Sequence, residues 1–393
     1  MRVLVATDKF KGSLSALQAA RAIMAGLEEG LPGVEVELCP MADGGEGTLE
    51  ALVEATGARV IALEAAGPMP SQSVKASWAM LEPGDGVGSA TFKAFADITS
   101  RTAIVEMAQA SGFSLVNKSD MNPLVATTFG TGQLIKDAMD RGCKTVVVGI
   151  GGSATVDGGT GIARALGYRF LDESGRELPP GGGPLERLAR IDASQRDERI
   201  AGTTFIAASD VDNPLLGEGG AARVFGPQKG ATPEQVTTLE RCLATLAERI
   251  RADLGIDVTR QSGLGAAGGA GAGLVAFCGA RITSGVALVA AAVGLDERIA
   301  GADLVLTGEG RLDTQTLRGK TPAGVMQAAL DRGVPVVLMA GAIKGDVESS
   351  LPPDAAAFSI IPGPIDVDEA MENATELLRS GAARLARLLV LLG

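Results

Sequence analysis

The sequence has 393 residues, of which 46% are hydrophobic, 21% charged and only 3% aromatic. This composition is typical of a folded chain whose core is built from Val, Leu, Ile and Ala, and the length predicts two domains. A net charge of −12 opposes binding to nucleic acid or to an anionic membrane surface, so we expect neither as a partner.

The absence of histidine narrows the chemistry further. It excludes Ser-His-Asp and Cys-His catalysis and the HExxH zinc site. No run of 18 apolar residues occurs and the N-terminus has only a short apolar stretch, so we expect a cytoplasmic protein. The four cysteines lie far apart without a CxxC pair, which favours core thiols over disulfides or structural zinc: Cys39, Cys143, Cys242 and Cys278.

Short apolar runs alternate with amphipathic stretches along the chain, which is typical of parallel strands covered by helices. Five runs suit the strands of one sheet: 3–6, 34–38, 304–307, 336–339 and 357–361. Residues 15–30 have the apolar spacing of a helix. The intervening part has strands of its own, predicted at 59–67, 73–81, 145–151 and 203–210.

Two of the five strands come from the start of the chain and three from its end. We therefore predict an α/β fold with a discontinuous, flavodoxin-like, doubly wound parallel sheet domain and a large inserted α/β domain. The first domain comprises residues 1–57 plus 288–393, and the second residues 58–287. The active site is expected in the cleft between them.

Charged side chains follow the first and third of these strands. The loop after the first strand contains Asp8, Lys9, Lys11, Gly12 and Ser13. In an open doubly wound sheet the ligand crevice lies beyond the carboxyl ends, where the strand order reverses. The residues after the third strand, Glu309, Arg311 and Asp313, are therefore expected to face Lys9 and Lys11. The alternative is a solvated loop with ordinary surface charges.

The segment PMADGGEGT, residues 40–48, follows the second strand. Asp43 stands before Gly44 and Gly45, which places a carboxylate on a flexible turn. Helix capping alone would explain Glu46 and Thr48. Asp43 is therefore the functional candidate in this segment.

The segment GIGGSATVDGGTG, residues 149–161, lies between a β-branched run and a helix predicted at 162–170. Glycines can turn backbone N–H groups toward an anion, and a helix N-terminus adds partial positive charge. Thr155 adds a hydroxyl donor. The groups expected to bind phosphate or a substrate carboxylate belong to Gly151, Gly152 and Ser153.

Asp157 lies in the same segment and suggests a general base or a metal ligand. As an exposed loop carboxylate it would contribute little to stability, so Asp157→Asn is expected to leave the fold intact and to lower turnover. The alternative is a tight turn in which Asp157 caps the following helix.

A further segment, residues 208–232, carries Asp210 and Asp212 at a strand end, followed by Arg223 and Lys229. Carboxylates could hold Mg²⁺ or act as a base, while the cations could bind phosphate or a carboxylate. This combination fits phosphoryl transfer to a small acid.

Two well-known phosphate-binding motifs are matched only in part, either in their residues or in their sequence context. GLGAAG, residues 263–268, matches GxGxxG, but no strand directly precedes it, so we interpret it as a glycine-rich helix entry. The Gly-Lys-Thr at 319–321 lacks the first glycine of a Walker A loop, because position 314 is Thr.

Seven blocks of the sequence, in order, resemble those of the class I glycerate kinase family: DKFKGSLSA, PMADGGEGT, NPLVATTFGTGQLI, GIGGSATVDGGTG, SDVDNPLLGEGGAARVFGPQKGA, GAAGGAGAG and TGEGRLDTQTLRGKTP. The resemblance covers nearly the whole chain. It implies ATP-dependent phosphorylation of D-glycerate, in most members at the 2-hydroxyl to give 2-phosphoglycerate. The chain departs from the family at Asn122, where an aspartate is expected, and in a longer segment at 92–103.

On this interpretation ATP and Mg²⁺ are the cofactors, D-glycerate is the substrate, and a homo-oligomer is compatible with the sequence. The catalytic candidates are Asp43, Asp157 and Asp210, with Asp43 and Asp210 as the candidate Mg²⁺ ligands. The sequence does not divide the roles of base and metal ligand among them. The binding candidates are Lys9, Lys11, Gly12, Ser13, Gly44, Gly45, Gly151, Gly152, Ser153, Lys229, Glu309 and Arg311.

Three alternatives remain at this point. The same kinase could give 3-phosphoglycerate. A non-catalytic sensor of small acids or nucleotides would need no convergence of carboxylates with lysines, and the chain shows no basic DNA-binding segment. A dinucleotide oxidoreductase would depend on GLGAAG alone, whose sequence context does not support it.

Overall fold

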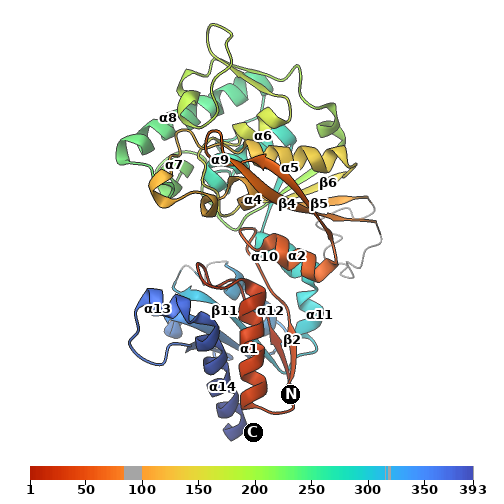
Figure 1. Cartoon of the computed structure of the whole chain (residues 1–393), viewed down its shortest axis with the longest axis vertical. Coiled ribbons are helices and arrows are strands. Elements are labelled where there is room, and N and C mark those ends of the chain that lie inside the picture. The colour runs from red at the N-terminus through yellow and green to blue at the C-terminus, as the bar shows by residue number, and fades with distance from the viewer. Residues whose placement is uncertain (84–99, 315, 317–319, 393) are drawn as a thin grey trace.

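The computed structural model describes residues 1–83, 100–314, 316 and 320–392. Within these ranges the chain forms two lobes, each built on one large sheet (Figure 1). Most of the longer segment expected at 92–103 lies outside the described residues, as does part of the Gly-Lys-Thr sequence at 319–321.

The five-stranded sheet unites strands from both ends of the chain: β1 (Arg2–Val5), β2 (Glu35–Leu38), β11 (Leu304–Leu312), β12 (Val336–Ile343) and β13 (Ala355–Ser359). All of its pairings are parallel, in the order β13-β12-β11-β1-β2. The five predicted runs therefore share one sheet, and the strand order reverses between β1 and β11. Strand β11 continues to Leu312, beyond its predicted end at 307.

Helices cover both faces of this sheet: α1 (Ala16–Gly30), α13 (Val367–Glu372) and α14 (Ala374–Leu392) on one side, and α2 (Thr48–Thr56), α10 (Gly285–Val293), α11 (Leu295–Ile299) and α12 (Thr321–Leu330) on the other (Figure 1). Ser15 and Gln18 form a capping box that starts α1 where the sequence predicts it. Helices α1 and α14 pack so closely that a Cβ at Gly26 would lie 2.0 Å from the Arg379 carbonyl oxygen.

The six-stranded sheet of the other lobe contains β3 (Arg59–Ala66), β4 (Ser73–Leu81), β5 (Thr102–Glu106), β6 (Thr145–Gly149), β9 (Thr204–Ala208) and β10 (Arg281–Thr283). Its order is β10-β9-β6-β5-β4-β3, and only the pairings of β4 with its two neighbours are antiparallel. The four strands predicted for this part of the chain are present, whereas β5 and β10 were not predicted.

The remaining helices and strands belong to the same lobe: α4 (Ala108–Ser111), α5 (Phe129–Asp140), α6 (Thr160–Ala165), β7 (Arg169–Leu171), β8 (Arg190–Asp192), α7 (Ala221–Phe225), α8 (Pro233–Arg249) and α9 (Ala266–Cys278). The prediction of a helix through 162–170 is wrong in its second half. Gly167 has a φ of +93°, which ends the helical path, and the chain continues as β7. GLGAAG leads into α9, which confirms the predicted helix entry.

A layer of helices lies between the two sheets, with α2 and α10 at its centre (Figure 1). One apolar cluster runs through this layer and includes Leu4 and Val305 of one sheet together with Ile104 and Val147 of the other. The proposed division at 57/58 and 287/288 stays a prediction, and its second boundary falls inside α10.

All four cysteines are free and buried, which confirms their expected place in the core. Among the described residues, no helix combines the length with the apolar character that a membrane span requires.

Candidate active site

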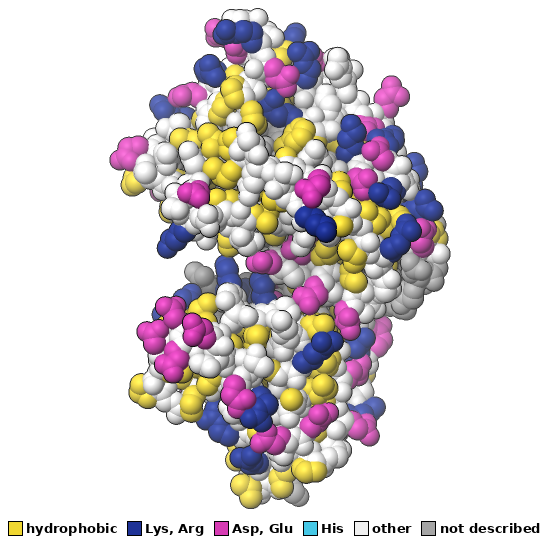
Figure 2. Space-filling model, viewed as in Figure 1, with side chains coloured by type: hydrophobic (Ala, Val, Ile, Leu, Met, Phe, Trp, Pro, Cys, Tyr) yellow, Lys and Arg dark blue, Asp and Glu magenta, His cyan; other side chains and the backbone are white. Residues whose placement is uncertain are grey.

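Loops from both sheets meet at a cavity of about 320 Å³ between the lobes. In Figure 2 the hollow between the lobes opens on the left, with acidic and basic side chains at its edge. The polar residues that line the cavity include Asp8, Lys9, Lys11, Asp43, Gly45, Gly151, Gly152, Ser153, Asp210, Lys229, Glu309 and Lys320. Most of the predicted site residues therefore converge here.

Lys9 is the electrostatic centre of this cavity. Its ammonium group lies 3.2 Å from Asp43 Oδ1 and 3.7 Å from Asp8 Oδ1. Burial by itself lowers the pKa of Lys9, but the two carboxylates outweigh it and raise that pKa. Burial raises the pKa of Asp8 to about 6, while for Asp43 the effect of Lys9 prevails and lowers the pKa. At neutral pH the geometry therefore keeps Lys9 and Asp43 charged.

The loop that carries Asp43 touches the glycine-rich segment of the other sheet. The backbone N–H of Gly151 donates to the Gly44 carbonyl oxygen at 3.1 Å. A Cβ at Gly151 would lie only 2.5 Å from the Cα of Gly45, so this contact between the sheets requires glycine. Gly44 holds the two loops together and does not line the cavity, whereas Gly45 does both.

The prediction that Asp157 is an exposed loop carboxylate is wrong, because its exposed fraction is 0% and it does not line the cavity. Its Oδ2 accepts hydrogen bonds from the Thr128 N–H and hydroxyl, both at 2.9 Å, and from the Gly161 N–H at 3.1 Å. Its Oδ1 accepts from the Gly159 N–H at 3.1 Å. Burial raises the pKa of Asp157, and these hydrogen bonds oppose that rise. Asp157 therefore corresponds more closely to the alternative prediction, in which it caps the following helix.

This arrangement also corrects the expected contribution of the helix N-terminus. Asp157 already binds the N–H groups at the start of α6, which is only six residues long. The side chain of Thr155 is fully buried and lies outside the cavity lining. Of this segment, only residues 150–153 line the cavity, and the polar groups among them belong to 151–153 and to the backbone.

Lys229 is hydrogen-bonded to the same segment. Its exposed fraction is 2%, and its ammonium group donates to Ser153 Oγ and to the Thr155 carbonyl oxygen, both at 2.7 Å. Burial lowers the pKa of Lys229 to about 7, although the negative charge of Asp157 opposes the change. Lys229 therefore fixes the position of Ser153 at the cavity wall.

Asp210 reaches the cavity from the end of β9. Its Oδ1 accepts a 2.5 Å hydrogen bond from the Ser284 hydroxyl, and its Oδ2 accepts from the Val286 N–H at 2.9 Å. The pKa of Asp210 is raised to about 6, mainly by burial and in smaller part by the charge of Asp43, while the two hydrogen bonds oppose the rise. Two of the three predicted carboxylates thus share the cavity.

The residues expected after the third strand are only partly placed as predicted, because Glu309 and Arg311 lie within the longer β11. Glu309 lines the cavity and accepts a hydrogen bond from the Thr316 hydroxyl at 2.6 Å. Arg311 lines neither this cavity nor its larger neighbour. Its side chain is 58% exposed and pairs with Asp313 at 3.3 Å, so it has no direct route to a ligand in this structure.

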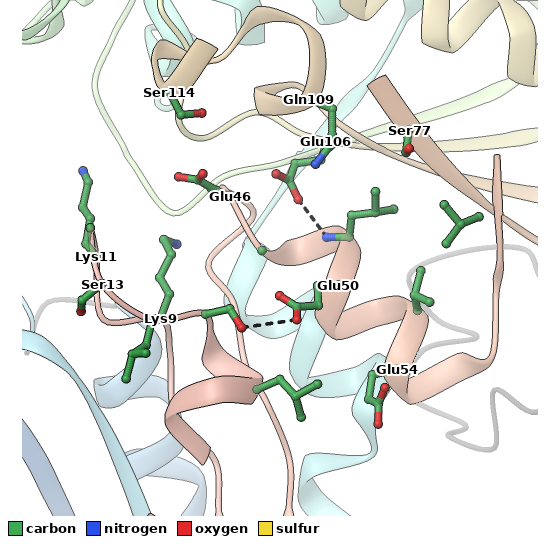
Figure 3. A pocket seen from close by; sticks show the side chains of 18 of the residues that line it. Lys9, Lys11, Ser13, Glu46, Glu50, Glu54, Ser77, Glu106, Gln109 and Ser114 are labelled. Atoms are coloured by element: carbon green, nitrogen blue, oxygen red, sulfur yellow. Dashed lines mark hydrogen bonds between the residues drawn. The ribbon is translucent and has the colours of Figure 1, made fainter. Parts of the chain in front are cut away.

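A second cavity of about 860 Å³ adjoins the first (Figure 3). Lys9 and Lys11 line both cavities, whereas Gly12 and Ser13 line only the larger one. The larger cavity also contains Glu106 at the end of β5, a residue that the sequence analysis missed. Burial raises the pKa of Glu106 to about 7, and its carboxylate accepts from the Leu49 N–H at 3.0 Å. The β-branched run that ends in Glu106 was the available signal.

Lys320 was also missed. It stands directly before α12 and lines the smaller cavity opposite Asp210 and Ser153. Its signal was the basic pair of the Arg-Gly-Lys-Thr sequence, which was considered only as a Walker A loop.

The donor set of the smaller cavity is compatible with Mg²⁺ held partly by a substrate. Among the described residues, no group of three or more Asp, Glu or Cys side chains could form a complete metal cage. Mg²⁺ in phosphoryl-transfer sites is commonly bound by one or two carboxylates together with phosphate oxygens and water. Asp43 and Asp210 supply two such carboxylates, and both hydrogen bonds to Asp43 use its Oδ1.

Comparison with known proteins gives a consistent result. The sequence model of the Glycerate kinase family matches residues 3–390. The chain is 45% identical to a glycerate kinase of Halalkalibacterium halodurans, over 98% of this chain and 97% of the relative. It is 40% identical to glycerate 2-kinase of Escherichia coli K12, over 100% and 98%. A crystal structure assigned as glycerate kinase 2 from Salmonella typhimurium LT2 matches with a TM-score of 0.80 at 42% identity, covering 100% of this chain and 98% of that one.

Proposed function

Because the chain belongs to the glycerate kinase family, we propose that it transfers the γ-phosphoryl group of ATP to a hydroxyl group of D-glycerate. The observation that carries the proposal is the convergence of Lys9, Asp43 and Asp210 on one cavity beside residues 151–153. Phosphoryl transfer needs mainly positioning and neutralisation of charge, and this cavity offers both signs of charge from two rigid sheets. An ATP-consuming reaction also fits the cytoplasmic location expected from the sequence.

The cations of the cavity are suited to the anionic groups of the two substrates. Lys9, Lys11 and Lys320, together with the backbone of residues 151–153, would bind phosphate oxygens or the carboxylate of D-glycerate. Lys229 has a different part in the proposal. Its ammonium group already donates to Ser153 and Thr155, so it would act by holding Ser153 in place.

The carboxylates are suited to the hydroxyl proton and to the metal. Asp43 stays ionised beside Lys9, so it could accept the proton of the attacking hydroxyl late in the transfer, when even a weak base suffices. Mg²⁺ would be held by Asp210, with Asp43 as the second candidate ligand. When bound, the ion would neutralise charge on the transferred phosphoryl oxygens.

A coupled assay of ADP release with ATP, Mg²⁺ and D-glycerate tests the proposal, and ³¹P NMR of the product identifies the phosphorylated hydroxyl. We expect ADP release that depends on D-glycerate and gives 2-phosphoglycerate, as the name of the E. coli relative suggests. A 3-phosphoglycerate product would overturn the assignment of the hydroxyl alone. Binding of D-glycerate or ATP without turnover would overturn the kinase and favour the sensor.

A further inference from the structure

The larger cavity, of about 860 Å³, has no part in the roles assigned so far beyond the two lysines that it shares with the smaller one. We propose that it holds the nucleoside part of ATP, with the triphosphate crossing into the smaller cavity. This inference rests on the proposed function and deepens it, because it says which substrate occupies which side of Lys9.

Charge decides between the substrates. Four carboxylates line the larger cavity: Glu46, Glu50, Glu54 and Glu106 (Figure 3). The larger cavity sets these four carboxylates against two lysines, whereas the smaller one sets five carboxylates against four lysines, so the carboxylate of D-glycerate and the triphosphate are better accommodated in the smaller cavity. The adenosine part is uncharged and is the portion of the two substrates that best suits the larger cavity. Its ribose hydroxyls are donors, and carboxylates accept hydrogen bonds from ribose hydroxyls in other nucleotide sites.

The floor of the cavity suits a purine base. Five aliphatic side chains line the cavity together with the carboxylates: Leu14, Leu17, Leu49, Val53 and Val60. Small-molecule sites typically combine such an apolar lining with a few polar groups that fix orientation. A volume of about 860 Å³ leaves ample room for a nucleoside, whereas D-glycerate alone would fill only a small part of it.

The two lysines fix the direction of the nucleotide. Lys9 and Lys11 line both cavities (Figure 3), as do Glu46 and Phe113, and these four residues mark the boundary between them. A triphosphate that passes between them would carry its γ-phosphoryl group toward Asp43 and residues 151–153. The Lys11 ammonium group lies 5.3 Å from the centre of the Phe113 ring, a contact that holds it at this boundary.

Obstruction of the larger cavity tests the inference. Glu54 is an exposed residue of α2 that lines the cavity, so Glu54→Trp would fill space there at little cost to folding. Glu28→Trp is the matched control, because Glu28 is an exposed helix residue that lines neither cavity. We expect Glu54→Trp to raise the KM for ATP by about tenfold or more and to change the KM for D-glycerate by less than about twofold, and Glu28→Trp to change neither.

Two results would overturn the inference. A selective rise in the KM for D-glycerate would place the acceptor in the larger cavity, and unchanged KM values in both variants would show that neither substrate occupies it. Inhibition by adenosine provides a second measurement that does not depend on a variant. Adenosine should compete with ATP and should not compete with D-glycerate. A wild-type protein without glycerate-dependent ADP release would instead refute the proposed function.

Discussion

Asp43 and Asp157 stand in similar sequence surroundings, each on a glycine-rich turn that follows a strand, yet the fold uses them in opposite ways. Asp157 is completely buried, and both of its oxygens accept hydrogen bonds from nearby N–H and hydroxyl groups. Asp43 lines the cavity, and both of its hydrogen bonds, from Lys9 and Gly45, go to a single oxygen.

The comparison shows that a carboxylate on a glycine-rich turn does not reveal its role by itself. What decides is whether the turn closes on the carboxylate or opens toward a cavity. At Asp157 the turn closes, because Thr128 from the preceding helix completes the set of donors. At Asp43 the glycine-rich segment donates the Gly151 N–H to the Gly44 carbonyl oxygen and leaves the carboxylate beside Lys9.

The largest effect on activity is expected at the open turn. Asp43→Asn removes the negative charge beside Lys9 and the candidate proton acceptor. It should therefore lower kcat by about 10³-fold, within the usual range for a lost acid or base, without a comparable loss of stability. Steady-state kinetics and a thermal unfolding curve on the same preparation check this. Asp212→Asn, at a nearby carboxylate outside the cavity lining, should retain wild-type turnover.

At the closed turn, substitution of Asp157 is expected to lower the stability of the fold. Asp157→Asn replaces one accepting oxygen by an NH₂ group that faces other donors. This leaves buried groups unsatisfied and should cost about 3 kcal/mol of unfolding free energy. Urea unfolding measures the loss directly. A midpoint equal to that of the wild type would show that the hydrogen bonds to Asp157 do not contribute as described.

Asp210 lies between these extremes, because it lines the cavity and also accepts two hydrogen bonds. Asp210→Asn keeps an acceptor for the Val286 N–H but loses the charge, so we expect a kcat about 10²-fold lower and a steeper requirement for Mg²⁺. Titration of activity with Mg²⁺ distinguishes the lower kcat from the changed requirement for Mg²⁺. Full activity at the wild-type Mg²⁺ concentration would remove Asp210 from the site.

The last effect concerns the pH dependence of stability at Lys229 and develops gradually over several pH units. Its pKa is about 7 when folded, against 10.5 ordinarily, so between these pH values the unfolded state binds more protons. The free energy of unfolding should therefore rise with pH from about 7 upward, by at most ~1.4 kcal/mol per pH unit. Lys229→Met should flatten this rise, whereas Lys136→Met, at an exposed lysine, should keep it. Equal slopes in all three proteins would contradict the described burial of the ammonium group.

Much of the fold and part of the site could be predicted from local patterns. The apolar runs predicted all five strands of one sheet, and the rule for carboxyl ends brought Lys9, Asp43 and Glu309 to one cavity. The burial of Asp157 could not be predicted in this way, because its partner Thr128 lies 29 residues earlier and meets it only in the folded chain.

The same limit applies to other residues of the site. Strand β5 and its terminal Glu106 follow a stretch without clear periodicity, so neither was found. Arg311 was expected in the loop after the third strand, but β11 continues to Leu312, so Arg311 lies within the strand and its exposed side chain pairs with Asp313. Sequence patterns thus predicted which strand ends meet, and the packing between the sheets determined which side chains face the cavity.

The kcat of Asp157→Asn, measured well below its unfolding midpoint, tests the central distinction most directly. If Asp157 holds the turn and Asp43 serves the reaction, the folded variant should turn over within about threefold of the wild type, despite its lower stability. A loss of about 10²-fold or more in a variant that is fully folded at the assay temperature would contradict the account and return Asp157 to the catalytic residues.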